Sequence, residues 1–253
     1  MVAGRAPAGK GVAATDGLLL DRLLYRDGLI LVVDKPAGLP VHAGPKGGSN
    51  LEDHLEPLRF GLPGRPHLAH RLDRDTSGCL VLGRHKKALR RLGRLFEEGR
   101  VEKVYWAVVR GTPEPSQGRI ALALEKRSTA ARGWWMQVAR EGGREAVTDY
   151  RVLASDAGRS LVECRPRTGR THQLRVHLAA IGHPIMGDPV YGSSGGPLML
   201  HARSIALPLY AGRPPIVVTA PLPPAFVAAA GDLVPEDADV PGAPDPAGLS
   251  EVV

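Results

Sequence analysis

The stretch His-Arg-Leu-Asp-Arg-Asp-Thr-Ser-Gly, residues 70–78, holds the residues of this chain that are best suited to chemistry. Asp73 stands between Arg71 and Arg74, and the Thr-Ser-Gly that follows predicts a sharp turn at 76–78. Neighbouring positive charge keeps a carboxylate ionised even where it is partly buried. An ionised, desolvated carboxylate is a competent nucleophile. Asp73 is therefore a candidate catalytic nucleophile, although most Arg-Leu-Asp-Arg stretches are surface ion pairs.

Metal and nucleotide chemistry find less support in the sequence. His172 and His177 lie five residues apart, roughly 140° around a helix, so they cannot grip one ion as an i, i+4 pair does. Asp73 and Asp75 form an Asp-x-Asp pair suited to magnesium, but the arginines beside them disfavour a dication. The sequence holds no P-loop, no Gly-x-Ser-x-Gly elbow and no Gly-x-Gly-x-x-Gly after a strand. We therefore expect no metal site.

The cysteine and hydropathy patterns predict a cytoplasmic protein. The two cysteines, Cys79 and Cys164, lie in strand-like runs without a Cys-x-x-Cys pair. This pattern indicates two reduced core thiols rather than a zinc site or a disulfide framework. No run approaches the roughly 18–20 apolar residues of a membrane span, and the N-terminus lacks the apolar segment of a secretory signal.

The charge is spread unevenly along the chain. Of the net +7, residues 1–14 carry +2 and residues 228–253 carry −6, which leaves +11 on residues 15–227. Both ends are poor in large apolar residues, so we expect two tails around one domain. A body this basic indicates a polyanionic partner, either nucleic acid or an acidic lipid surface.

A first helix is predicted over residues 86–98. Three apolar residues fall at i, i+3 and i+7 and predict a core-facing stripe, namely Leu89, Leu92 and Phe96. Three basic residues fall at i, i+4 and i+7 on the opposite face, namely Lys87, Arg91 and Arg94. Such a basic face is either simply solvated or a contact for phosphates.

A second helix is predicted over 170–181, with three apolar residues on one face and a stop at Gly182. His172 and Arg175 share its other, polar face. Short apolar runs predict strands at 28–36, 79–84, 102–111, 118–124, 145–153, 160–166 and 198–207. Strands that enclose a few helices without βα alternation predict an α+β fold on a mixed, largely antiparallel sheet.

Five stretches in order give the sequence a family resemblance. HRLDRDTSGCLVL (70–82) resembles the signature of the RluA-type RNA pseudouridine synthases. Four further stretches are similar to motifs of that family: LLYRDGLILVVDKPAGLPVHAG (23–44), EKVYWAVVRG (102–111), TGRTHQLRVHLAAIGHPIMGDPVYG (168–192) and LMLHARSIAL (198–207). The resemblance covers about residues 20–210 and makes chance an unlikely cause.

The resemblance implies an activity and assigns residues to it. Family members convert uridine in RNA to pseudouridine without a metal or cofactor. Asp73 matches the catalytic aspartate, and Arg175 matches the arginine that pairs with it. Tyr105 matches the tyrosine that stacks on the target base and assists proton removal from its carbon 5. Arg71 matches a residue that fills the gap left by the flipped nucleotide.

The resemblance also implies the fold and the partner. We expect the pseudouridine synthase catalytic fold over residues 15–227, with flanking helices and a central RNA-binding cleft. Many relatives carry an N-terminal RNA-binding domain, for which about 20 residues leave no room here. This favours recognition by the catalytic domain alone of a compact hairpin loop in ribosomal or transfer RNA. We expect a monomer without an obligate protein partner or membrane contact.

The sequence leaves several alternatives open. The carboxylate attacks either the anomeric carbon of the ribose or carbon 6 of the uracil ring. Trp134 and Trp135 either stack on RNA bases or pack within the protein. The acidic tail either competes with RNA for the basic body or only aids solubility. A non-catalytic RNA-binding protein could keep the same fold, but it would have no need of Asp73, Tyr105 and Arg175 together.

Overall fold

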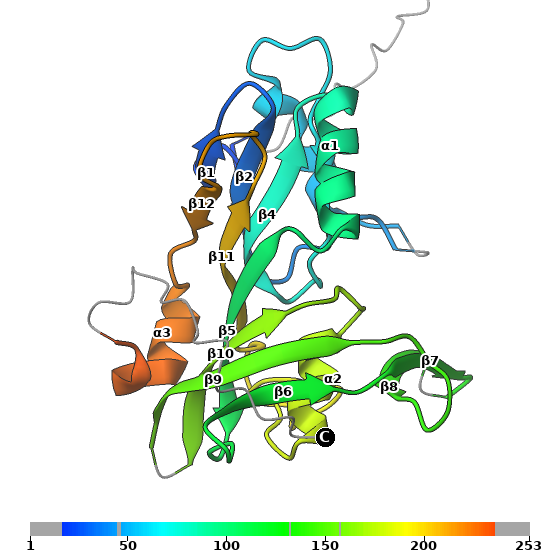
Figure 1. The fold of residues 1–253 in the computed structure, drawn as a ribbon, viewed down its shortest axis with the longest axis vertical. Coiled ribbons are helices and arrows are strands. Elements are labelled where there is room, and N and C mark those ends of the chain that lie inside the picture. Colours follow the sequence, from blue (N-terminus) through cyan, green and yellow to red (C-terminus); the bar gives the residue numbers. More distant parts are fainter. Residues whose placement is uncertain (1–16, 45–46, 132, 157, 236–253) are drawn as a thin grey trace, which may run out of the picture.

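The computed structural model describes residues 17–44, 47–131, 133–156 and 158–235. Ten strands form one sheet in the order β1-β2-β4-β11-β5-β10-β9-β6, with β12 beside β11 and β3 beside β4 (Figure 1). β4 and β11 run parallel, and the other paired strands of the sheet are antiparallel. The predicted mixed, largely antiparallel sheet is thus confirmed. The strands are β1 (Leu23–Arg26), β2 (Ile30–Lys35), β3 (His67–Leu68), β4 (Ser77–Gly83), β5 (Glu102–Arg110), β6 (Gln117–Ala121), β9 (Val147–Ser155), β10 (Arg159–Pro166), β11 (Leu200–Leu207) and β12 (Ile216–Thr219).

The central strand β4 is buried on both faces, which explains its continuous apolar sequence. Its side chains alternate between two cores, as the period of a strand requires. Cys79 and Val81 face the core that the first helix covers. Leu80 and Leu82 face a core closed by two short 3₁₀ helices, η1 (Leu51–His54) and η2 (Glu56–Arg59). The lower half of the sheet in Figure 1 has its own core around β5 and β10.

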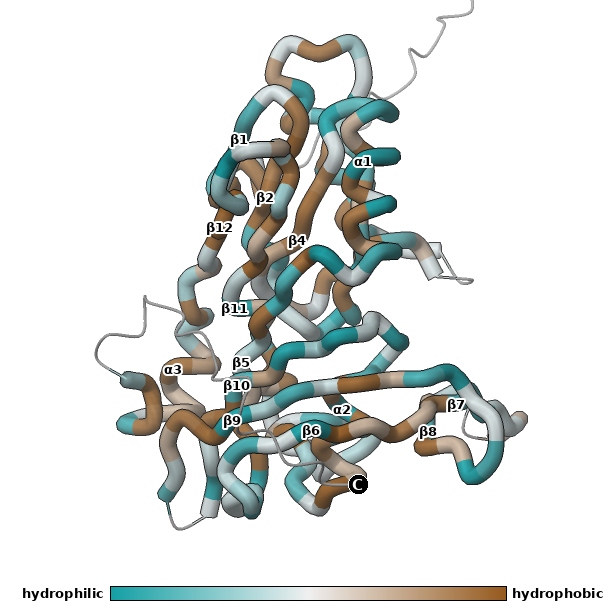
Figure 2. The backbone as a smooth tube through the Cα atoms, viewed as in Figure 1, coloured by the Kyte–Doolittle hydropathy of each residue, from teal (hydrophilic) through white to brown (hydrophobic). Residues whose placement is uncertain are grey.

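Helix α1 (Lys86–Glu97) matches the first predicted helix. The side chain of His85 caps it by accepting the amide N–H of Ala88. The helix packs on β4, and Figure 2 shows its apolar side facing the sheet and its hydrophilic side facing outward. The predicted basic stripe is exposed, and Lys86 and Arg90 extend it. The buried apolar stripe includes Leu92 as predicted, together with Ala88 and Leu95.

The second helix, α2 (Gln173–Ala180), is shorter than the predicted 170–181. It cannot begin earlier because His172 adopts a left-handed backbone conformation, with φ 55° and ψ 17°. The face opposite the apolar stripe, predicted to be polar, is buried as well. Every residue from Gln173 to Leu178 is buried, because α2 lies between β10 and a β-hairpin that the strand prediction missed.

That hairpin consists of β7 (Leu124–Thr129) and β8 (Gly133–Val138), which form a separate two-stranded sheet. It projects from the lower half of the molecule in Figure 1. An apolar cluster of Leu124, Met136, Ala146 and Val176 attaches it to α2. Trp134 and Trp135 both lie on β8, and Trp134 is 48 % exposed.

The C-terminal segment corrects the predicted tail boundary at residue 228. Helix α3 (Pro224–Ala230) and the 3₁₀ helix η3 (Gly231–Leu233) cross that boundary. Phe226, Ala230 and Leu233 are buried in the core of the lower half. The sequence of this segment did not indicate this packing, because it is rich in alanine and has few large apolar residues. The remaining predicted tails, residues 1–14 and 236–253, lie outside the described residues.

The sharp turn predicted at 76–78 lies three residues earlier. The amide of Thr76 donates to the carbonyl of Asp73 at 3.2 Å, so the turn spans residues 73–76. Gly78 instead belongs to β4, with φ +105°. A side chain there would collide with the carbonyl oxygen of Ala202 on β11. Gly78 therefore permits the close approach of the two parallel strands.

Gly78→Ala should lower the free energy of unfolding by about 3 kcal/mol or more, because it adds both a steric clash and an unfavourable φ. Gly93→Ala is the matched control, since Gly93 lies within α1 and has open space around it. It should raise stability by about 0.5–1 kcal/mol through helix propensity. Urea denaturation of both variants measures the difference, and equal stability would contradict the assigned role of Gly78.

Candidate active site

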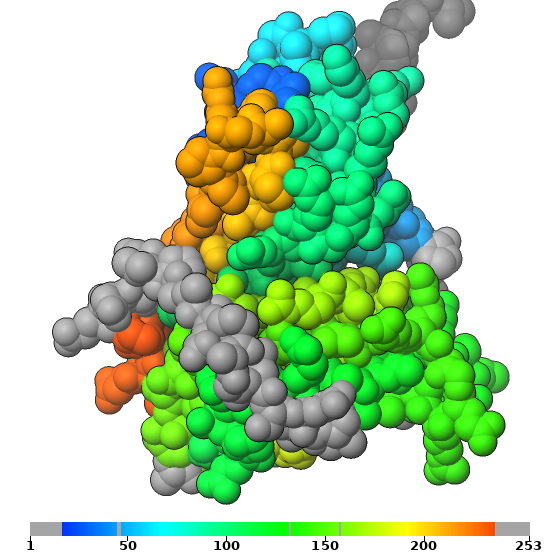
Figure 3. Space-filling model, in the orientation of Figure 1, coloured from blue at the N-terminus to red at the C-terminus, as the bar shows by residue number. Residues whose placement is uncertain are grey.

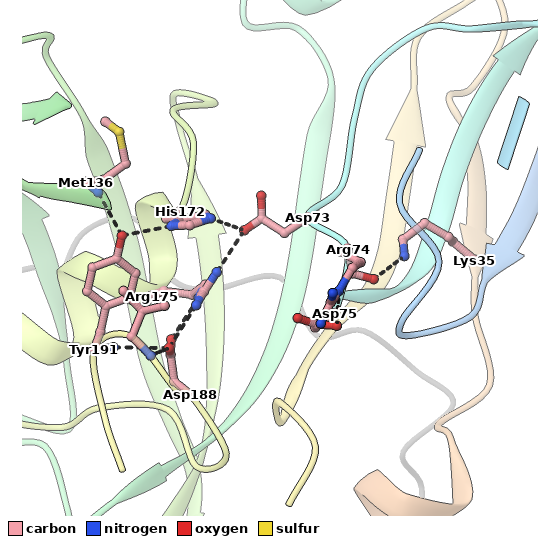
Figure 4. Close-up of polar contacts among 10 residues, drawn as sticks. Lys35, Asp73, Arg74, Asp75, Met136, His172, Arg175, Asp188 and Tyr191 are labelled. Carbon is pink, nitrogen blue, oxygen red and sulfur yellow. Dashed lines mark hydrogen bonds and ion pairs between the residues drawn. The ribbon is translucent and has the colours of Figure 1, made fainter. Parts of the chain in front are cut away.

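The loop that carries Asp73 is anchored by a buried lysine. Lys35, at the end of β2, donates from Nζ to the carbonyl oxygens of Pro36, Leu39 and Arg74, each at 2.8 Å. Burial lowers the pKa of Lys35 to about 8, although Asp75, Asp73 and Asp34 counteract the shift. These three bonds tie the turn at residues 73–76 to the loop after β2 and so fix the backbone beneath the carboxylate. Figure 4 shows the bond from Lys35 to Arg74.

The side-chain nitrogen atoms that approach Asp73 come from distant parts of the sequence. Nη1 of Arg175 lies 3.7 Å from Oδ2 of Asp73, and Nε2 of His172 lies 3.9 Å from the same oxygen. Arg74, the neighbour in sequence, instead bonds to Asp75 at 2.9 Å and points to solvent. The prediction that the flanking arginines supply the positive field is therefore corrected for Arg74. The predicted proximity of Arg175 to Asp73 agrees with the geometry.

Arg175 is itself held by a second carboxylate. Its Nε and Nη2 donate to the two oxygens of Asp188 at 2.7 and 2.8 Å, and both side chains are buried. The amides of Val190 and Tyr191 donate to the same carboxylate. Burial opposes charge on both partners, yet their pairing raises the pKa of Arg175 and lowers that of Asp188. The pair thus stays charged and presents a fixed guanidinium to Asp73.

His172 forms the wall between Asp73 and the hairpin. Its Nδ1 is 2.8 Å from the hydroxyl of Tyr191, and its ring stacks on Trp134 with centroids 5.1 Å apart. The Tyr191 hydroxyl also accepts the amide N–H of Met136 on β8 at 2.9 Å. Burial lowers the pKa of His172, and the charges of Arg175 and Arg71 act in the same direction against those of Asp73 and Asp188. The imidazole is therefore neutral near pH 7.

A cavity of about 610 Å³ opens over Asp73. The predicted site residues Arg71, Tyr105 and Arg175 all line it, together with His172 and Lys103. Its walls come from the end of α1 and the start of β5 on one side and from residues 166–175 on the other. Figure 3 shows these segments bordering each other, blue-green against yellow-green. The cavity thus lies where the two halves of the sheet meet, at the predicted central cleft.

The residues that line the cavity differ in exposure and in pKa. Arg71 is exposed, so its guanidinium can reach both the cavity and solvent. Burial, followed by the charge of Asp73, raises the pKa of Tyr105, which keeps its hydroxyl protonated. Burial lowers the pKa of Lys103 to about 8. A cavity of this size, with more cations than carboxylates and with apolar walls, suits an anionic ligand that carries a planar group.

Sequence reasoning missed Lys35, Asp188 and the role of His172. Lys35 and Asp188 lie inside two of the quoted motifs, Asp-Lys-Pro and Gly-Asp-Pro-Val-Tyr-Gly. The sequence alone did not indicate which residues they bond to. The bond from Lys35 to the loop of Asp73 reaches Arg74, 39 residues away in the chain, and Asp188 pairs with Arg175, 13 residues away. Within the described ranges, no three or more His, Cys, Asp or Glu side chains gather in an arrangement that could hold a metal ion. No helix there is long and apolar enough to span a bilayer.

Known proteins resemble this chain in sequence and in fold. A profile of the family described as RNA pseudouridylate synthase matches residues 29–180. A Zymomonas mobilis protein named as an uncharacterized RNA pseudouridine synthase is 48% identical over 214 residues, 83% of this chain and 97% of that protein. The ribosomal large subunit pseudouridine synthase D of the same bacterium is 39% identical over 68% of this chain and 56% of its own length. The solved structure of human RNA pseudouridylate synthase domain containing 4 matches with a TM-score of 0.73 and 31% identity, over 86% of this chain and 95% of that one.

Asp188→Asn should lower the free energy of unfolding at pH 7 by about 3–5 kcal/mol, because it removes the buried carboxylate that pairs with Arg175 and leaves only Asp73, 3.7 Å away, as a counter-charge. The pKa of Asp188 is lowered in the folded state, so its contribution is complete above the pKa of the unfolded chain. The contribution is lost as the pH falls through the folded pKa. The gap between variant and wild type should therefore shrink in acid.

Urea denaturation at pH 7 and in acid tests this expectation, with Asp156→Asn as the control. Asp156 pairs with Arg159 at the surface, where the same substitution should have a much smaller effect. Equal losses in the two variants would contradict the structural importance assigned to the Arg175–Asp188 pair.

Proposed function

The chain belongs to the RluA-type RNA pseudouridine synthases, and we propose that it attacks a uridine of structured RNA with Asp73. The family profile and the relatives establish an isomerase that acts on RNA. The observation that carries the assignment is the position of Asp73 in the cavity, 3.7 Å from a guanidinium that a second carboxylate holds in place. A fixed cation beside the carboxylate stabilises its charged form and limits its rotation.

The proposed reaction breaks the bond between N1 of uracil and the ribose and joins the ribose to carbon 5. Asp73 attacks either the anomeric carbon or carbon 6, and both routes use the same carboxylate and the same cavity. The proton on carbon 5 then leaves, and N1, which has lost its bond to the ribose, takes up a proton, so that the product is an isomer of uridine. Because burial raises the pKa of Tyr105, its phenol is no base by itself. We assign Tyr105 to stacking on the uracil. To take part in the proton transfer, its hydroxyl would first have to give its own proton to another group.

Neither carbon 5 nor the glycosidic bond can be reworked inside a stacked helix, so the target nucleotide must leave the stack. The cavity lies in the range of volumes that accommodates ligands of this size. We assign Arg71, exposed beside Asp73, to the gap that the nucleotide leaves behind. The end of α1 lines the same cavity, and the exposed cations along this helix are suited to contact the phosphate backbone.

We propose that the substrate is a hairpin loop in ribosomal or transfer RNA. The name of one relative, a ribosomal large subunit pseudouridine synthase, favours ribosomal RNA. We also propose that the protein acts as a monomer. We further propose that the protein acts in the cytoplasm, without metal or cofactor, because a carboxylate nucleophile needs neither.

Asp73→Asn should abolish pseudouridine formation and leave RNA affinity within a few fold of wild type, because the amide is nearly isosteric but not nucleophilic. A tritium-release assay on RNA labelled at carbon 5 of uridine measures turnover, and filter binding measures affinity. The matched control is Asp75→Asn, two residues away and paired with the exposed Arg74. Residual turnover above a few per cent of wild type would falsify the role of Asp73.

Arg71→Lys should slow modification of a structured hairpin substantially more than that of an unstructured oligonucleotide. Extracting a base from a folded hairpin costs a few kcal/mol, and less from a loose strand. The planar guanidinium can stack on the exposed bases, which an ammonium cannot do.

Single-turnover rates on the two RNAs decide between this role and a simple ionic one. If Arg71 only supports the charge of Asp73, lysine should largely replace it and both RNAs should slow by the same factor. Arg74→Lys controls for the loss of a guanidinium in the same loop, because that side chain points to solvent. It should leave the two rates unchanged.

A further inference from the structure

His172 occupies a backbone conformation that histidine rarely adopts. Its φ of 55° lies in the left-handed region, which it shares among the described non-glycine residues only with Phe60. Glycine or asparagine would adopt this conformation at lower cost. Strain of this kind persists where the surrounding structure holds the residue for a purpose. The question is what the ring does there.

The hydrogen bonds around Tyr191 favour one tautomer of that ring. The amide of Met136 can only donate, so the oxygen of Tyr191 accepts there. The hydroxyl hydrogen of Tyr191 is then available to Nδ1 of His172, 2.8 Å away. A neutral imidazole that accepts at Nδ1 carries its proton on Nε2. Nε2 is the ring nitrogen that lies 3.9 Å from Oδ2 of Asp73.

The contacts of the ring hold this arrangement in place. One face of His172 stacks on Trp134, and Tyr191 meets the ring edge-on with centroids 5.6 Å apart. Four charged groups act on the pKa of His172: Asp73 and Asp188 raise it, and Arg175 and Arg71 lower it. Burial favours the neutral ring. Figure 4 shows the resulting chain of contacts from β8 through Tyr191 and His172 to Asp73.

We propose that His172 is a positioning residue that donates its Nε2–H to Asp73 when RNA is bound. The proposal rests on the proposed function, in which Asp73 is the nucleophile. His172 and Arg175 both approach Oδ2, so together they fix that oxygen and leave Oδ1 for attack. Distances of 3.7 and 3.9 Å are long for hydrogen bonds, but such contacts often tighten only in the substrate complex.

The same contacts couple the β7–β8 hairpin to the nucleophile. Met136 sets the tautomer through Tyr191, and Trp134 sets the tilt of the ring. Both residues lie on β8, which projects from the body of the protein next to the cavity. A shift of β8 on RNA binding therefore reaches Asp73 through His172, without any change in the main sheet.

A first test reads the tautomer directly and needs no activity. The chain has nine histidines, so His172→Gln identifies the His172 signals in long-range proton–nitrogen NMR spectra of histidine labelled with ¹⁵N. We expect a protonated Nε2 and an unprotonated Nδ1 in the free protein near pH 7. Tyr191→Phe should allow both tautomers. A wild-type ring protonated on Nδ1, or an imidazolium, would overturn the proposal.

A second test measures single-turnover rates at saturating RNA. His172→Phe keeps a ring for Trp134 but has no donor, and we expect a loss of about 10- to 100-fold with affinity little changed. His172→Gln returns a donor near the position of Nε2 and should recover most of the rate. Tyr191→Phe should cost about 2- to 10-fold, the worth of one hydrogen bond. The control Tyr150→Phe removes a hydroxyl that donates to the carbonyl of Pro115, away from the cavity, and should match wild type.

The outcomes separate positioning from packing and from the wider function. If His172→Phe keeps the wild-type rate, or if Gln is as slow as Phe, the ring has a packing role only and the proposal is wrong. If His172→Phe loses affinity rather than rate, the ring belongs to RNA binding and the proposal is equally wrong. If wild type and Tyr150→Phe form no pseudouridine, the proposed function fails, and the NMR test still decides the orientation of His172.

Discussion

The site depends on one buried arginine that faces two carboxylates. Arg175 is charged although it is buried, and the carboxylate of Asp188, which accepts two short hydrogen bonds from it, offsets the cost of burying that charge. That pairing uses Nε and Nη2 and leaves Nη1 toward Asp73. The nucleophile thus faces a cation that is fixed in place, because any movement of the guanidinium would leave the buried carboxylate of Asp188 without its partner. This constraint explains why α2 is buried on almost every side and why the hairpin must cover it.

The sheet places the two halves of the site against each other. Asp73 lies in the loop before β4, anchored by Lys35 from β2, whereas Arg175 and His172 lie at the start of α2, beside β10. The parallel contact between β4 and β11, which Gly78 permits, joins the half that carries Asp73 to the half that carries α2. The cavity is therefore a consequence of how the two halves of the sheet, each packed on its own cores, meet in one molecule.

Local sequence patterns predicted those parts of the fold in which the residues of one helix or strand determine which of its faces is buried. The apolar stripe of α1 and the continuous apolar run of β4 follow from periodicity, and Asp73 stood out by its position between arginines. The partners of Asp73 could not be found this way, because an ion pair depends on which distant segments meet. His172 misled the helix prediction for a related reason: a tertiary network of Tyr191, Trp134 and Asp73 fixes its backbone against its local preference. The alanine-rich α3 was missed because neighbouring residues, rather than its own, supply most of its core.

The most direct test of the account is a crystal structure of the chain with an RNA hairpin whose target uridine carries fluorine at carbon 5. Fluorine cannot leave as the proton does, so the reaction should halt in the active site. The account requires the target nucleotide to lie in the cavity against Tyr105, with a carboxylate oxygen of Asp73 in contact with the anomeric carbon or carbon 6 and with Arg175 still paired to Asp188. A target base that remains stacked in the hairpin, or a nucleotide whose reacting carbons face a residue other than Asp73, would contradict it.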